Sequence, residues 1–435
     1  MTAQGGPVGG QGSSTFDRLD REMRSPAGPA MARRLNRGMV IELLSQYRQL
    51  SRTDLRVLTG LARPSVSAIL NDLLADGIIR AAGLASRSAD SGRPPQLFEI
   101  NPDHCMYLGV HVSTEHIALS LTDAVGTTLR TGKLPSPTGG GDVAATVTGG
   151  VLRWLKSTGR SEGLVAVGLG VAGMVDQSTG WVIFAPTLDW RDVPLQSALE
   201  RSLAAGVRVI NEAHAAALAE AEEGAAVGAS DFAWVTLGVG VGSGLMVAGH
   251  LVEGTRGVAG EIGHCRVTER PITCHCGRQG CLETIASTSA LAARLRQLGA
   301  KHDDDADAAV LAGGLERAKT GEQRVVAVFD EAARALALAL SYVGNVVGTP
   351  LIVLGGPFGS HNEWFAERVQ EVLREYRVDQ IRLRVVASSI EAAEVRGPVL
   401  LARRLRPIGS GPTIGSDAHR APLPAGQPSS RQGGN

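Results

Sequence analysis

The sequence predicts an α/β protein with a small helical domain at its N-terminus and larger lobes built on mixed β-sheets. Three observations favour this fold class. The chain has 435 residues, which is too long for one ordinary hydrophobic core. Between about residues 33 and 100, short helical patterns precede a pair of strands. From about residue 103 to 405, apolar strands punctuated by glycine alternate with Ala-rich helices, which is typical of α/β lobes.

Composition sets the outer limits of the folded part. Residues 1–32 and 408–435 are rich in Gly, Ser and Pro, so we expect both segments to be disordered. Two domains, 33–102 and 103–407, are predicted between them. Apolar residues make up 43% of the chain and charged residues 20%, as in ordinary globular proteins. The sequence has no run of eighteen apolar residues and no signal segment, so a cytoplasmic location away from membranes is expected.

Three helices are predicted in the N-terminal domain. The first is marked by five apolar residues at imperfect helical spacing: Leu35, Met39, Ile41, Leu43 and Leu44. Ser51 is a suitable N-cap for a second helix over 52–59, which Gly60 ends. A third helix begins near Arg63, tolerates Pro64 in its first turn and stops at Gly77. Strands are expected at 77–79 and 97–100, with a polar Arg/Ser/Gly stretch between them.

The second and third helices, joined by a turn that contains glycine, form a helix-turn-helix pattern whose second helix would read DNA. Its inward face is apolar: Val66, Ile69, Leu70, Leu73 and Leu74. Arg63, Ser65 and Ser67 near its N-terminus therefore fall where side chains can reach base edges or phosphates.

The polar stretch between the two strands would form a wing. It carries Arg87 and Arg93 next to Gly and Pro, a thin segment that suits a minor groove. Residues 33–93 contain ten Arg against five Asp or Glu, although the whole chain has 43 basic and 43 acidic residues. This local excess favours a winged helix-turn-helix that binds double-stranded DNA. The alternative is a packing module without DNA contacts.

The other half of the chain contains a cluster of metal-ligating residue types. His264, Cys274, Cys276 and Cys281 offer one imidazole and three thiolates, which suit a structural Zn²⁺ ion with no open coordination position. The alternative is a loop of free thiols, with His275 and Cys265 as bystanders.

The same residues carry a family resemblance. Glu261-Ile-Gly-His264, followed by Cys274-His-Cys276-Gly-Arg-Gln-Gly-Cys281-Leu-Glu283, resembles the E-x-G-H and C-x-C-G-x-x-G-C-x-E motifs of the ROK family (repressors, open reading frames, kinases). The order of domains is similar to the family's transcriptional-regulator branch. The resemblance covers about residues 33 to 405. It implies a two-lobed actin/hexokinase-like sugar-kinase fold, with the His and three Cys binding zinc.

The resemblance also implies a sugar pocket. The family's sugar-binding positions fall on five residues of this chain: Asn211, Glu212, Glu261, His264 and Glu283. Carboxylates and amides suit this task because they accept or bridge adjacent hydroxyls at fixed angles. A pocket built from such groups discriminates strongly against ligands that lack the matching hydroxyl.

Departures from the family's kinases predict that phosphotransfer is lost. The first phosphate loop of the kinases reads D-x-G-G-T, whereas this chain has His111-Val112-Ser113-Thr114-Glu115. The second loop keeps its glycines but has Val239 where Thr is usual. Glu212 stands in place of the catalytic Asp. Gly355-Gly356 survives, although such glycines can also serve folding alone. Because phosphoryl transfer depends on positioning and charge neutralisation, we expect no catalytic residues here.

The resemblance therefore implies a sugar-responsive transcriptional regulator, a repressor of carbohydrate-utilisation genes. It would bind a DNA operator as a homodimer or homotetramer. A small sugar would change the closure of the two lobes and thereby weaken or strengthen operator binding. The competing hypothesis is an active ATP-dependent sugar kinase with a DNA-binding appendage.

Overall fold

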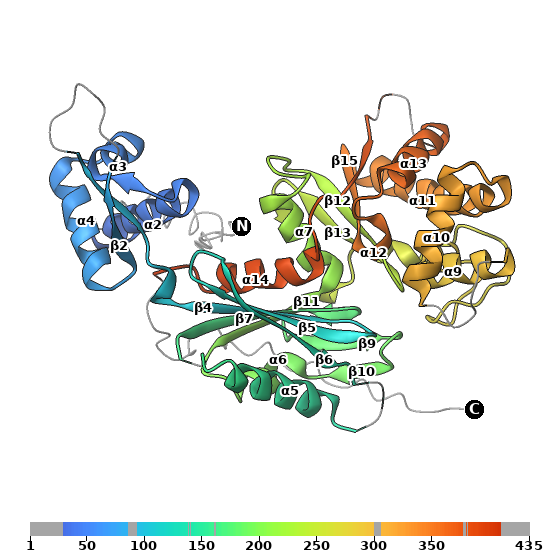
Figure 1. Cartoon of the computed structure of the whole chain (residues 1–435), viewed down its shortest axis with the longest axis horizontal. Coiled ribbons are helices and arrows are strands. Elements are labelled where there is room, and N and C mark those ends of the chain that lie inside the picture. The colour runs from blue at the N-terminus through green and yellow to red at the C-terminus, as the bar shows by residue number, and fades with distance from the viewer. Residues whose placement is uncertain are drawn as a thin grey trace, which may run out of the picture.

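The computed structural model describes residues 29–85, 94–137, 139, 141–160, 162–299, 306–376, 380 and 382–409. These residues form an N-terminal module, a first lobe and a second lobe, arranged in a row (Figure 1). The first lobe lies in the middle, so it contacts both of the other parts. Of the predicted disordered segments, 1–28 and 410–435 lie outside the described residues.

The N-terminal module consists of three helices and a three-stranded sheet of order β1-β3-β2. Its elements are α2 (Pro29–Tyr47), β1 (Leu50–Ser51), α3 (Arg52–Thr59), α4 (Arg63–Ala75), β2 (Ile79–Leu84) and β3 (Gln96–Ile100). Ser51 caps α3 in a capping box with Asp54, and Gly60 ends the helix with a left-handed φ of 68°. The predicted bounds of the second helix and the start of the third are therefore confirmed.

The first helix, α2, contributes part of its apolar surface to the core. Val40 and Leu44 are buried together with Ile41, whereas Leu35 and Met39 are 60% and 41% exposed. Of the five apolar residues that mark this helix in the sequence, Leu35 and Met39 therefore lie outside the core. The buried residues of the module join a hydrophobic cluster that includes Tyr107, Ala166 and Ala402 of the first lobe.

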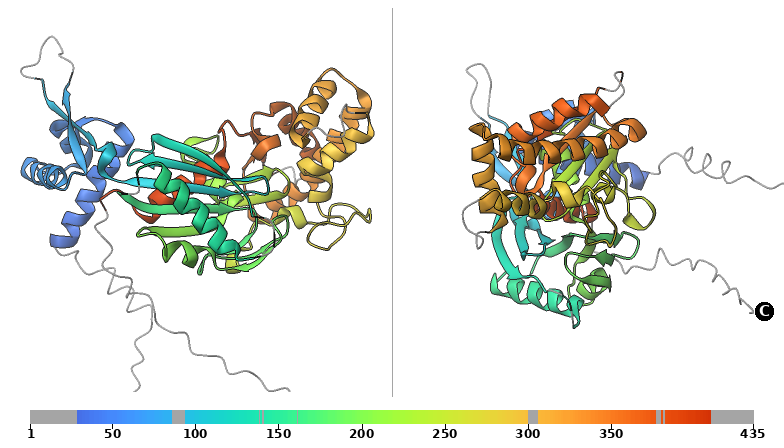
Figure 2. Two further views of the ribbon diagram at one scale, coloured as in Figure 1. Left: turned by 60° about the horizontal axis from the view of Figure 1, so that its bottom comes forward. Right: turned by 90° about the vertical axis from the view of Figure 1, so that its right-hand side faces the viewer.

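The first lobe is built on a mixed five-stranded sheet of order β11-β7-β4-β5-β6. Its strands are β4 (Met106–Val112), β5 (His116–Asp123), β6 (Thr128–Pro135), β7 (Leu164–Val171) and β11 (Gly206–Asn211), preceded by the short helix η1 (Pro102–His104). α5 (Val143–Ser157) and α6 (Leu195–Glu200) cover one face. α14 (Ala393–Leu405) crosses the other face (Figures 1 and 2). A small antiparallel sheet of β8 (Met174–Asp176), β9 (Trp181–Ala185) and β10 (Trp190–Val193) extends this lobe.

The second lobe has a five-stranded sheet of order β14-β13-β12-β15-β16. Its strands are β12 (Phe232–Leu237), β13 (Val241–Val247), β14 (His250–Leu251), β15 (Leu351–Gly355) and β16 (Arg384–Ala387). Its helices are η2 (Thr255–Gly257), η3 (Ile262–His264), α8 (Glu283–Ala286), α9 (Thr288–Gln297), α10 (Asp307–Lys319), α11 (Gln323–Val347), α12 (Gly356–Gly359) and α13 (Glu363–Tyr376). α11 and α13 pack together around Phe329, Phe358 and Phe365 in one core cluster.

α7 (Glu212–Glu223) is layered between α14 and the second-lobe sheet, which explains why it is rich in alanine. It has neighbours on both sides, and small side chains let both approach. A Cβ atom on Gly397 of α14 would lie 1.9 Å from the carbonyl oxygen of Ala215. The two lobes are therefore joined through two closely packed helices, and a cleft opens beside their N-termini.

No helix among the described residues is long and apolar enough to cross a membrane.

Candidate functional site

A cleft with a volume of about 290 Å³ brings together residues of both lobes. All five residues predicted to bind sugar line it: Asn211, Glu212, Glu261, His264 and Glu283. Residues of both predicted phosphate loops line it as well, including His111, Glu115 and Val239. The turn before α14 and the first turn of that helix complete the wall.

The side chain of Asn211 forms most of its hydrogen bonds with backbone atoms. It is the N-cap of α7, and its Oδ1 accepts hydrogen bonds from the amides of Ala213 (2.7 Å) and His214 (3.3 Å). Its Nδ2 donates to the carbonyl of Gly173 at 2.9 Å. One amide proton remains for a ligand. The sequence argument missed this capping role, although an Asn directly before an Ala-rich helix is a suitable signal for it.

Glu212, the first residue of α7, is paired with His111 at the end of β4. The Oε2 atom of Glu212 lies 2.7 Å from Nε2 of His111. Burial opposes a charge on His111, but the hydrogen bond and the charge of Glu212 outweigh it and raise the pKa of the imidazole. In the predicted phosphate loop, His111 was noted only as the residue that replaces an acid. The structure makes it the partner of Glu212.

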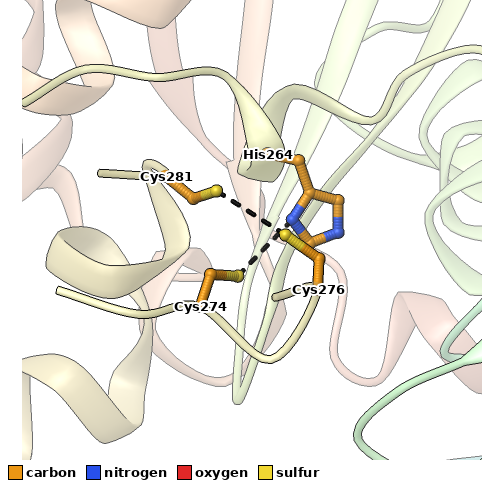
Figure 3. Close-up of side chains that lie close together, drawn as sticks. All are labelled: His264, Cys274, Cys276 and Cys281. Atoms are coloured by element: carbon orange, nitrogen blue, oxygen red, sulfur yellow. Dashed lines mark hydrogen bonds between the residues drawn. The ribbon is translucent and has the colours of Figure 1, made fainter. Parts of the chain in front are cut away.

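The four predicted metal ligands meet beside the cleft in the second lobe (Figure 3). Nδ1 of His264 lies 3.6 Å from Sγ of Cys274, and Sγ of Cys276 lies 3.7 Å from Sγ of Cys281. All four ligand atoms lie within 4.8 Å of one another. The turn that holds the cysteines relies on Gly277, whose φ is 85°. Cys265 and His275 lie outside the cluster, as expected of bystanders.

This geometry fits one tetrahedral metal ion. Metal–sulfur and metal–nitrogen bonds of zinc place neighbouring ligand atoms about 3.5–3.8 Å apart in a tetrahedron. The separations of 3.6 and 3.7 Å lie in that range, and the sulfur–sulfur distance is too long for a disulfide. Burial raises the pKa of the Cys274 and Cys281 thiols, and a dication would counter this because it stabilises thiolates.

Glu261 and Glu283 connect the cluster to the cleft. Nε2 of His264 faces the Oε2 atom of Glu261 at 3.8 Å, so the imidazole turns one nitrogen toward the cysteines and the other toward the cleft. Glu283 accepts a hydrogen bond from the amide of Val241 at 3.2 Å, in the glycine-rich turn. Burial, followed by the charge on Glu283, raises the pKa of Glu261 to about 7.

The glycine-rich segments have structural partners of their own. A Cβ atom on Gly240 would lie 2.8 Å from the Glu283 carboxylate, so this glycine lets that side chain into the cleft. A Cβ atom on Gly355 would lie 1.7 Å from the ring of Trp234. Gly355 therefore serves the packing of β15 beside β12. The first predicted phosphate loop is a short turn between β4 and β5, in which Ser113 bonds the carbonyl of His116.

The predicted DNA contacts lie at the start of α4. Arg63 and Ser65 are exposed and Ser67 is half-buried, and α4 has no side-chain N-cap. Arg87 and Arg93 lie outside the described residues.

Part of the basic excess of the N-terminal module is neutralised within the module. Arg33 pairs with Asp72 and Arg37 with Asp76, which ties α2 to α4. Arg80 pairs with Glu99 at 2.7 Å. The argument from charge counting did not foresee these pairs, because the partners are distant in sequence.

Glu394 is a further cleft residue for which the sequence offered no signal. It is the second residue of α14, and it lines the cleft. Its Oε1 atom is buried and has no hydrogen-bond partner among the described residues. Burial raises the pKa of its carboxyl. A single Glu at the start of a C-terminal helix, about 110 residues after the motifs, cannot be linked to them by spacing.

Comparisons with known proteins give one consistent family. A xylose repressor from Caldicellulosiruptor bescii is 26% identical over 361 residues, which cover 79% of this chain and 88% of that protein. A crystal structure of a ROK family transcriptional regulator, a homolog of the E. coli Mlc protein, has a TM-score of 0.71 at 22% identity, covering 86% of this chain and 96% of that one.

Kinases appear among the similar proteins too. A ROK family glucokinase from Streptomyces griseus, solved with glucose and AMPPNP, has a TM-score of 0.59 at 30% identity, covering 69% of this chain and 99% of that one. The model of the ROK family itself matches residues 107–404, which is more than half of the chain. Together with the site geometry, this shows that the chain belongs to the ROK family.

Proposed function

We propose that this chain is a sugar-responsive, DNA-binding transcriptional repressor. The observation that carries the proposal is the combination of a cleft lined by carbohydrate-type acceptors with an N-terminal module whose second and third helices have helix-turn-helix order. The similarity to a xylose repressor over 79% of the chain supports it. The cleft suits a small sugar effector, and the helix-turn-helix suits a DNA operator.

The N-terminal module, 33–102, is proposed as a winged helix-turn-helix. α3 and α4 are joined by a short turn at Gly60, and the exposed, uncapped N-terminus of α4 carries Arg63 and Ser65. Free amides at a helix N-terminus attract phosphate, and Arg63 adds a cation there. β2 and β3 lead into and out of the wing, where Arg87 and Arg93 are proposed to contact DNA.

In the second domain, 103–407, Zn²⁺ held by His264, Cys274, Cys276 and Cys281 is proposed as a structural ion. It would fix the segment between Glu261 and Glu283, which supplies two of the proposed sugar ligands, and it has no open position for chemistry. Because Nε2 of His264 faces the cleft, this residue can ligate the metal and still face the sugar.

Loss of phosphotransfer is proposed as well. A general base at position 212 would need a carboxylate that is free to take a proton from a sugar hydroxyl, and Glu212 is bound to His111 instead. The similarity to a glucokinase favours the alternative of an active kinase. Titration with magnesium-ATP separates the two. We expect no sugar-dependent ATP binding and no ADP release, whereas steady turnover would establish the kinase.

The experiment that tests the regulator is selection of bound sequences from random double-stranded DNA, followed by mobility shifts with and without sugars. We expect a specific operator with paired half-sites, since a homodimer or homotetramer is proposed. Arg63→Ala is expected to weaken operator binding by about tenfold or more. Arg374→Ala, at an exposed position of α13 in the second lobe, removes the same charge far from the module and should not change operator binding. Failure to select any DNA would refute the proposal.

A further inference from the structure

The carboxylate of Glu394 lies in the cleft, but the proposed sugar site gives it no role. Its Oε1 atom is buried and accepts no hydrogen bond from the described residues, although it belongs to the cleft wall. Its own backbone amide is the hydrogen-bonding group that serves the carboxylate. An acceptor that is removed from water without a donor costs free energy, so a ligand that brings a donor to this carboxylate would be favoured.

None of the described neighbours of Glu394 donates a hydrogen bond to its Oε1 atom. The nearby charged groups are His111, Glu212 and Glu220. The Nε2 atom of His111 is engaged by Glu212 at 2.7 Å, and Glu220 is itself a buried carboxylate bonded to Ser388. Glu394 therefore adds an acceptor next to a histidine–glutamate pair that is already satisfied. His111, Glu212 and Glu394 all line the cleft.

The charge of the cleft restricts what that ligand can be. Five carboxylates line it: Glu115, Glu212, Glu261, Glu283 and Glu394. Among the described residues that line it, none is Lys or Arg. Phosphate groups in proteins are bound by Arg, Lys or free backbone amides. Two amides of the glycine-rich turn are already engaged. The amide of Val241 donates to the Glu283 carboxylate, and the amide of Gly238 donates to the carbonyl of Gly240.

We propose that Glu394, beside the His111–Glu212 pair, forms a second recognition point that binds a hydroxyl or amine of an unphosphorylated carbohydrate and excludes a phosphate group. The inference rests on the proposed function, since it names the class of effector for the same cleft. The zinc-proximal carboxylates Glu261 and Glu283 come from the second lobe, and Glu394 from the helix packed on the first. A sugar that reaches both ends contacts both lobes, which is what a closure-driven effector requires.

Glu394→Gln provides the test, because it keeps the shape of the side chain and removes its charge. Thermal unfolding of the full chain is measured with xylose, glucose, glucosamine and N-acetylglucosamine, each compared with its terminal phosphate ester. At least one free sugar should stabilise the wild type, and its phosphate should bind about a hundredfold more weakly. In Glu394→Gln the free sugar should lose about tenfold in affinity. The ratio between the affinities of the free sugar and its phosphate ester should also decrease. A general loss of structure would not change this ratio.

Glu391→Gln is the matched control, because Glu391 is exposed three residues earlier and does not line the cleft. Its sugar affinity should equal that of the wild type. The inference is overturned if Glu394→Gln binds sugars within twofold of the wild type, or if a phosphorylated sugar binds as tightly as its free form. It is also overturned if no sugar binds while operator binding persists. If sugars bind as expected but no DNA is selected, the proposed function fails and the assignment of Glu394 stands.

Discussion

At the scale of single residues, the proposed loss of phosphotransfer depends on the pairing of His111 with Glu212. Nε2 of His111 and Oε2 of Glu212 lie 2.7 Å apart, and both side chains are largely withdrawn from solvent. Histidine at position 111 places a donor where the family's kinases have an acid. The carboxylate of Glu212 is therefore directed at a neighbouring side chain, and the pair is a fixed part of the wall.

The pair predicts a pH dependence of stability. The folded-state pKa of His111 is raised above its unfolded value of about 6.5, so its stabilising contribution is fully present below that value. It is lost as the pH rises through the folded pKa. The free energy of unfolding of the wild type should exceed that of His111→Gln most at about pH 6, and the gap should shrink toward pH 9, by at most about 1.4 kcal/mol per pH unit. Glu212 and Glu394 favour the charged imidazole, while His116 opposes it.

Chemical denaturation of both proteins at a series of pH values measures this gap. A gap that stays constant from about pH 5.5 to 9 would show that the pKa of His111 is the same in the folded and unfolded states. Because His111 and Glu212 are not part of the cysteine cluster, loss of metal does not enter the comparison.

The cysteine cluster gives a second prediction at this scale. Cys274→Ser removes one soft ligand from a four-ligand site, so bound zinc should fall from about one ion per chain to well below it, with a lower unfolding midpoint. Cys265→Ser is the control, because Cys265 is half-buried next to His264 in sequence but lies outside the cluster. Elemental analysis of both variants measures their zinc content and tests the prediction. Equal zinc in both variants would contradict the assignment of Cys274.

At the scale of elements, two glycines make the close packing of α14 against the first lobe possible. Gly109 of β4 and Gly168 of β7 are register partners in neighbouring parallel strands. A Cβ atom on Gly109 would lie 2.5 Å from the Val399 side chain, and one on Gly168 would lie 1.9 Å from the carbonyl oxygen of Pro398. The two strands thus form a flat surface on which α14 lies.

Gly168→Ala should therefore displace α14, since its nearest obstacle is backbone and cannot rotate away. We expect a loss of about 1–3 kcal/mol in the free energy of unfolding. Gly313→Ala is the control, because Gly313 is an exposed residue of α10 and nothing lies within 4 Å of the added atom. There alanine should stabilise the helix by about 0.5–1 kcal/mol. Denaturant unfolding of both variants measures the difference, and equal effects would mean that α14 adapts freely.

The sequence predicted the elements whose signal is local. The apolar strands and Ala-rich helices expected from about residue 103 to 405 form, for example in β4, β12 and α7. The short sheet of β8, β9 and β10 was not predicted, because strands of three to five residues have too little periodicity. α14 was not predicted either, because Pro398 interrupts its helical pattern.

The residues of the cleft likewise fall into those that the sequence could predict and those that it could not. Glu261, His264 and Glu283 could be named because they stand within or beside the motif of metal-ligating residues. His111 and Glu394 could not, because their roles arise only when β4, α7 and α14 meet. His111 and Glu212 are 101 residues apart, and no spacing rule links them.

At the scale of the whole molecule, α14 connects the cleft to the N-terminal module (Figure 1). Its first turn places Glu394 and Val395 in the cleft wall. Ala402, near its other end, joins the cluster that contains Val40, Leu44 and Leu70 of the module. Two ion pairs, Arg396 with Glu223 and Arg404 with Glu222, hold the helix to α7. A ligand that shifts the start of α14 therefore acts on one rigid element whose far end supports α2 and α4.

The contact that fixes this far end is a hydrogen bond from the Tyr107 hydroxyl to the carbonyl of Arg406 at 2.9 Å, just after the end of α14. Tyr107→Phe keeps the buried ring and removes this bond together with the contact between the hydroxyl and the Cys105 thiol, so it should cost about 1 kcal/mol of stability. Because Tyr107 does not line the cleft, sugar affinity should stay unchanged. The ratio of operator affinities without and with sugar should fall severalfold, since coupling between two sites depends on the element that joins them.

Trp190→Phe is the matched control for this last prediction. It removes a comparable bond, from Trp190 Nε1 to the carbonyl of Pro137 at 3.0 Å, on the side of the first lobe that carries α5. Mobility shifts with the selected operator, at zero and at saturating sugar, give the ratio for each protein. If both variants reduce it equally, the effect is general loosening of the first lobe. If only Tyr107→Phe does so, the signal passes along α14, because that variant alone releases the end of the helix that contacts the N-terminal module.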